Sequence, residues 1–77
     1  MLDKLADVQH GIWSHWMEYL FSVCQEYGDG NMVIPKEKVE RWKRQMKTSY
    51  SELSEPEKDS DRNVAFDVLK VVQKEMM

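Results

Sequence analysis

Apolar residues recur every three or four positions along the first third of the chain, and this spacing constrains the fold more than any other feature of the sequence. The stripe consists of Leu5, Val8, Ile12, Trp16, Leu20, Val23 and Tyr27. Because an α-helix completes a turn every 3.6 residues, these side chains share one helical face. The pattern predicts one long amphipathic helix near residues 3–27, with Trp16 in the core and Trp13 at the edge of the stripe.

Glycines and prolines mark where the helices are predicted to end and begin. The segment GDGN, residues 28–31, ends the first helix, and MVI, residues 32–34, predicts a short extended segment. Pro35 fits the first turn of a second helix near residues 35–48, and a third helix is predicted near residues 55–75. The apolar lines of these two helices consist of Val39, Trp42 and Met46, and of Val64, Val68, Val71 and Val72.

The sequence therefore predicts a mostly all-α fold: a single domain spanning residues 1–77, built as a compact three-helix domain with a short extended segment between helices 1 and 2. A chain of 77 residues lies near the lower limit for one self-sufficient core, and its single cysteine, Cys24, allows no internal disulfide. The apolar arc of the first helix is also wider than two neighbouring helices easily cover. We therefore expect a homodimer.

Residues 50–62, YSELSEPEKDSDR, contain the start of the third helix. Ser54 followed by Glu57 three positions later is the pattern of a capping box, in which each residue bonds to the other's backbone amide. Pro56 fits the first turn, where a missing amide donor costs nothing. Most of this stretch is thus predicted to be a helix start.

Asp61 is left unexplained by capping, because its spacing places it on the face of the valine stripe. A buried carboxylate needs a partner, and the candidates are Tyr50, His10, Lys43 and the indole N–H groups of Trp13 and Trp16. We expect Asp61 to be a buried structural clamp that ties helix 3 to helix 1 or to the loop; within a ligand site it would position Tyr50 or His10. The alternative is a ligand contact.

Charge is unevenly distributed along the chain. Residues 36–47 carry six bases and two acids, whereas residues 1–30 carry five acids and one base, and residues 51–77 carry seven acids and four bases. The basic helix could simply offset its acidic neighbours, or it could form an anion site. Its bases encircle the helix axis, so nucleic-acid binding is the less favoured interpretation.

An aromatic side chain flanked by cations suits a nucleobase with its phosphate. The candidate ligand-binding residues are Trp13, Trp42, Lys43, Arg44 and Tyr50. Structural or positioning roles are expected for His10, Ser54, Glu57, Asp61 and Arg62. The alternative for Trp13 and Trp42 is a place at the core edge or an interface.

The sequence carries no pattern typical of an enzyme or of a metal site. His10 and His15 are five positions apart and point away from each other on a helix, so we expect no metal and no cofactor. No catalytic triad order or phosphate-binding glycine loop is present. Without a signal peptide pattern or a membrane-spanning stretch, the expected location is the cytoplasm.

Two blocks of the sequence resemble the ryanodine-receptor-type (RyR) domain: HGIW, residues 10–13, and YSELSEPEKDSDR, residues 50–62. The matching residues are His10, Trp13, Tyr50, Leu53, Ser54, Glu55, Glu57, Lys58, Asp61 and Arg62. The segments WSHWMEYLFSVC and RWKRQM are similar to those of short proteins of tailed phages and prophages. This second resemblance implies a phage or prophage origin, with the host cytoplasm as location.

The RyR resemblance implies a non-catalytic binding module for a small anionic, nucleotide-like ligand. The alternative is a homodimeric adaptor that binds a host or phage protein through the exposed flank of the first helix and the methionine-rich C-terminal end, residues 76–77.

Overall fold

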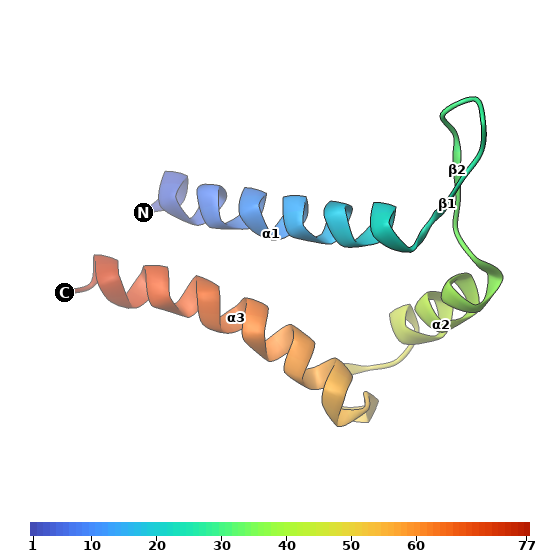
Figure 1. Cartoon of the computed structure of the whole chain (residues 1–77). Helices are drawn as coiled ribbons and strands as arrows, with labels where there is room; N and C mark the ends of the chain where they lie inside the picture. The colour runs from blue at the N-terminus through green and yellow to red at the C-terminus, as the bar shows by residue number, and fades with distance from the viewer.

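The computed structural model describes residues 1–77 as three helices with a short strand pair between the first two (Figure 1). The elements are α1 (Leu2–Val23), β1 (Gln25–Glu26), β2 (Met32–Val33), α2 (Lys36–Met46), the 3₁₀ turn η1 (Tyr50–Glu52) and α3 (Glu55–Glu75). The predicted all-α, three-helix fold with an extended segment between helices 1 and 2 is confirmed. The predicted bounds of α3 agree with the structure.

The first helix ends about one turn earlier than predicted. Cys24 already has an extended backbone, and β1 and β2 pair antiparallel, with Gln25 opposite Val33 and Glu26 opposite Met32. The chain leaves the helix because the hairpin offers the backbone other partners. The amide of Tyr27 donates to the carbonyl of Asn31 at 2.8 Å instead of to a helical carbonyl.

The hairpin turn explains why this segment cannot remain helical. Gly30 adopts a φ of 91°, which is the left-handed region that glycine enters without steric cost. The Asp29 carboxylate accepts hydrogen bonds from both the backbone amide and the side-chain amide of Asn31. GDGN therefore forms a closed turn, and the hairpin projects from the end of α1 (Figure 1).

Helices α1 and α3 run side by side in opposite directions, so the two chain termini lie at the same end of the molecule (Figure 1). Lys4 and Glu75 form an ion pair at this end. Val8 and Ile12 of α1 lie across a shallow cavity from Val64 of α3, so the two apolar stripes face each other as their spacing predicts. Away from the termini the two helices diverge, and α2 lies at the open end (Figure 1).

The helices enclose no buried core. None of the 77 residues is buried, and Trp16, predicted to be core, keeps 41% of its surface exposed. That prediction is wrong because Trp16 lines open cavities between α1, α2 and α3 and is not enclosed by the helices. The α1–α3 contact thus holds the termini together and leaves the opposite end open.

The start of α3 is stabilised by the predicted capping box. The Ser54 hydroxyl accepts the Glu57 amide at 3.4 Å, and a Glu57 carboxylate oxygen accepts the Ser54 amide at 3.2 Å. Arg62 bonds to Glu55 and Asp59, at 3.1 and 2.8 Å. These contacts, the Asp59 bond first, raise the pKa of Arg62. The predicted capping box of Ser54 and Glu57 is therefore confirmed.

We predict that Ser54→Ala lowers the free energy of unfolding by about 1 kcal/mol, because the Glu57 amide loses its acceptor. Chemical denaturation followed by circular dichroism measures the loss. Ser51→Ala is the matched control, since the Ser51 hydroxyl contacts only that of Ser49. Equal denaturation midpoints for the two variants would contradict the cap.

Candidate functional site

A groove lies at the open end of the molecule, between the second half of α1, the helix α2 and the start of α3. It has two halves that share Trp16, Tyr19, Trp42, Gln45, Thr48 and Leu53. The basic half, around Arg41 and Arg44, has a volume of about 880 Å³, and the apolar half, around Met17 and Met46, has one of about 600 Å³. Both volumes fall in the range of small-molecule sites.

Three aromatic side chains form the wall between the two halves. The rings of Trp16 and Tyr19 meet edge to face, with centroids 6.1 Å apart, and those of Tyr19 and Trp42 lie 6.5 Å apart at a tilt of 57°. Trp16 and Tyr19 are three positions apart and so lie on the same face of α1. The contact of Tyr19 with Trp42 joins α2 to α1, and this aromatic wall gives the groove its flat surfaces.

The basic half brings two guanidinium groups to the aromatic wall. Arg41 and Arg44 are three positions apart on α2 and line the same cavity, and neither forms a salt bridge within the chain. The only ion pair made by α2 is internal, between Lys36 and Glu40. The basic helix is therefore not neutralised by direct ion pairs with the acidic helices.

Glu57, which forms the capping box of α3 with Ser54, also lines the basic half together with the two arginines. The hydrogen bonds from the side chain and the backbone of Ser54, in that order, lower the pKa of Glu57. The positive charges of Arg44 and Arg41 lower it further. Glu52 lines this half too, so the cavity offers both cations and hydrogen-bond acceptors.

The apolar half has a different chemical character. Met17 and Leu20 of α1, Met46 of α2, and Tyr50 and Leu53 of the connecting segment line it. Lys58 lies over the ring of Tyr50, 5.8 Å from its centroid. Asp61 is the only charged side chain that lines this half.

The structure brings together three of the five predicted ligand-binding residues. Trp42 and Arg44 line the basic half, while Trp42 and Tyr50 line the apolar half. Trp13 and Lys43 line neither half, and Trp13 instead stacks on His10 with ring centroids 5.9 Å apart. A role of any of these residues in ligand binding stays a prediction.

Sequence reasoning missed Arg41 and Tyr19, which also line the groove. The spacing of three between Arg41 and Arg44, and between Trp16 and Tyr19, would have placed each pair on one helical face. The sequence offered no sign that Lys43, adjacent to Arg44, would lie outside the groove. Which face of α2 lines the groove depends on how α2 is oriented against α1.

Asp61 does not act as a buried clamp within the chain. Its side chain is exposed, and it forms no hydrogen bond or salt bridge, so it ties neither Tyr50 nor His10. The prediction fails because the carboxylate stays exposed at the edge of the apolar half and meets no hydrogen-bond donor there. The alternative, that Asp61 contacts a ligand, stays open.

No group of three or more His, Cys, Asp or Glu side chains is arranged to hold a metal ion. His15 lies at the groove, with its ring edge to face with Trp16 at 6.2 Å, whereas His10 lies beside Trp13. None of the helices combines the length and the apolar character that crossing a membrane requires.

Comparisons of the chain with protein families, with curated proteins and with solved structures find no match.

We predict that the free energy of unfolding falls as the pH drops below about 4, in part because of Glu57. The folded state lowers the pKa of this carboxyl group. Its contribution to stability is therefore present above the unfolded-state pKa and is lost as the pH falls through the folded-state pKa. Glu57→Gln should lose less stability than the parent between about pH 6 and pH 3, measured by denaturant titrations at each pH.

Glu18→Gln is the control for this prediction, because Glu18 is exposed and forms no hydrogen bond or salt bridge. Its acid dependence should parallel that of the parent. If the curve of Glu57→Gln also runs parallel to the parent, Glu57 is not a source of the acid sensitivity.

Proposed function

We propose that the chain is a non-catalytic binding module whose groove takes a small anionic, nucleotide-like ligand. The observation that carries this proposal is that Arg41 and Arg44, free of salt bridges, line the same cavity as Trp16, Tyr19 and Trp42. Planar guanidinium groups bind phosphate through paired hydrogen bonds, and aromatic faces stack on a base. The resemblance of residues 50–62 to the RyR domain supports the same ligand class.

The acidic residues of the basic half narrow the class of ligand further. Glu52 and Glu57 balance the formal charge of the two arginines, so the cavity does not attract anions by net charge alone. A ligand that carries both an anionic group and hydrogen-bond donors, as a nucleotide does through its phosphate and its ribose hydroxyl groups, satisfies both kinds of side chain. Inorganic phosphate alone satisfies only the arginines.

The proposed setting is the cytoplasm of a bacterial host, with the chain encoded by a phage or prophage, and the proposed assembly is a homodimer. A second candidate function is a homodimeric adaptor for a host or phage protein. One observation favours it: large apolar side chains, including Leu2, Phe21, Met46 and Met76, are exposed.

The test is isothermal titration calorimetry with nucleoside monophosphates, cyclic mononucleotides and cyclic dinucleotides, at one fixed salt concentration and beside inorganic phosphate. We expect at least one nucleotide to bind and phosphate to bind far more weakly. Arg44→Ala should weaken the binding by at least tenfold, since a charge-assisted hydrogen bond contributes about 1.5–3 kcal/mol.

Lys43→Ala is the matched control. It removes the same charge from the adjacent position of α2, but Lys43 does not line the groove. Its dissociation constant should stay within about twofold of the parent's, a free-energy change of less than 0.5 kcal/mol, with the oligomeric state of both variants verified by sedimentation. Equal weakening by Arg44→Ala and Lys43→Ala would contradict a site in the groove. The absence of binding by every nucleotide would favour the adaptor.

A further inference from the structure

The three helices form a single layer. The principal extents of the molecule are 50, 33 and 16 Å, and the shortest is about one and a half times the width of about 10–12 Å of one helix with its side chains. Domains normally consist of two packed layers with the core between them. One layer of amphipathic helices leaves apolar surface exposed, which agrees with the absence of any buried residue.

The chain exposes more surface than is expected of a folded monomer of its mass. The accessible surface of the chain is 6539 Å², whereas a folded monomer of 9.2 kDa is expected to expose about 4,900 Å². The excess of about 1,600 Å² is twice what one partner buries in a standard interface, and it lies in the range of obligate dimers. A second copy of the chain exposes the same excess, so two copies can cover each other.

Part of the exposed apolar surface lies on the side of the layer that carries the apolar half of the groove. Met17 and Leu20 line the apolar half of the groove, and Trp13, one turn before Met17, continues their line along α1. Leu69 of α3 and the C-cap residue Met76 lie within about 80° of Asp61 around the helix axis, and Asp61 lines the same half. We call this side, formed by Trp13, Met17, Leu20, Met46, Leu69 and Met76, the apolar face.

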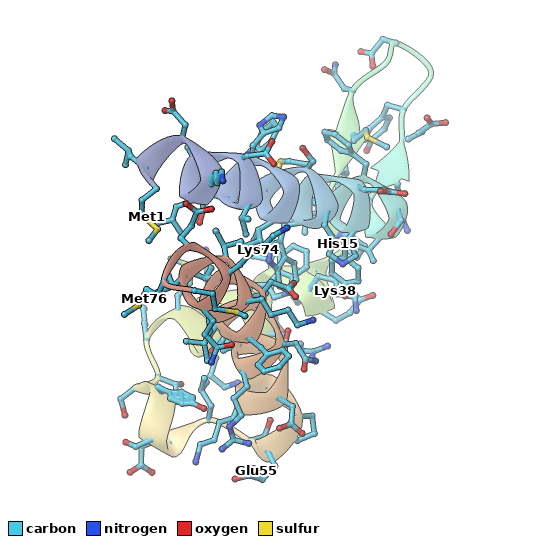
Figure 2. All side chains as sticks on the ribbon, turned by 90° about the vertical axis from the view of Figure 1, so that its left-hand side faces the viewer. Met1, His15, Lys38, Glu55, Lys74 and Met76 are labelled. Carbon is cyan, nitrogen blue, oxygen red and sulfur yellow. The ribbon has the colours of Figure 1, made fainter.

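The basic half of the groove opens on the other side. His15 lines the basic half and Met17 the apolar half, and residues two apart point about 160° away from each other around a helix. Figure 2 shows His15 and Lys38 close together in the view, with Met1 and Met76 on the opposite side, at the chain termini. Covering the apolar face therefore leaves Arg41 and Arg44 accessible.

We infer that a second copy of the chain stacks on the apolar face, so that two layers enclose one core. This deepens the proposed homodimer by naming the paired surface, and it is independent of the identity of the ligand. A two-fold contact uses the same face on both copies, so a single self-complementary face is sufficient. Met46, with 83% of its surface exposed at the rim of the groove, is placed to enter the apolar half of the other copy.

Asp61 is the one charged side chain of the apolar half and has no partner within the chain. It lies exposed at the edge of that half, so a second copy can cover the apolar side chains without enclosing the carboxylate.

The test is sedimentation velocity from about 2 to 200 µM, together with melting temperatures over the same range, because dimerisation linked to folding makes the melting temperature depend on concentration. We expect a species of twice the 9.2 kDa chain mass and a melting temperature that rises with concentration. Trp13→Lys and Leu69→Lys should each raise the dissociation constant of the dimer at least tenfold. These side chains are 55% and 46% exposed in the single chain, so neither holds its fold together.

Tyr27→Lys is the matched control, since Tyr27 is 63% exposed but lies in the hairpin, away from the apolar face. Its dimer should dissociate as the parent's does. A parent that stays monomeric at the highest concentration, with a constant melting temperature, would overturn the dimer itself. If both Trp13→Lys and Leu69→Lys leave the dissociation constant of the dimer unchanged, the dimer exists but the apolar face is not its paired surface.

Discussion

The contact between the apolar stripes of α1 and α3 is the constraint on which the rest of the structure depends. The stripes meet near the chain termini, where Lys4 pairs with Glu75, and separate toward the opposite end. Where they separate, Trp16 and Tyr19 line the groove between α1, α2 and the start of α3, and Tyr19 meets Trp42 of α2. The groove, the aromatic wall and the exposed apolar face are all consequences of this one divergence.

The two sides of the layer differ in chemistry because each helix presents different residues to each side. On α2, Arg41 and Arg44 belong to the basic half, whereas Met46 belongs to the apolar half. The aromatic wall is shared, so assembly on one side and ligand binding on the other would act on the same rings. A second copy packed against Trp16 and Trp42 would fix the surface on which a base stacks, and this would reduce the entropy that a ligand loses on binding.

The helices and the cap of α3 could be predicted from the sequence because they depend on local rules. The spacing of the apolar residues predicted the helices, and the pair Ser54 and Glu57 predicted the capping box with its hydrogen bonds. The end of α1 was predicted about one turn too late. The hairpin competes with the helix for the backbone amide of Tyr27, which donates to the carbonyl of Asn31. The exposure of Trp16 and Asp61, and the position of Lys43 outside the groove, depend on the angle between helices. No periodicity within one helix encodes that angle.

The placement of the termini has a practical consequence. Both ends of the chain lie at the closed end of the α1–α3 pair, opposite the groove (Figure 1). A fluorescent label or an affinity tag attached at either end would therefore stand away from the aromatic wall. Because the ends are adjacent, a short peptide could join them into a circular backbone, which would reduce the conformational entropy of the unfolded chain. New ends could then be opened in the exposed turn around Gly30.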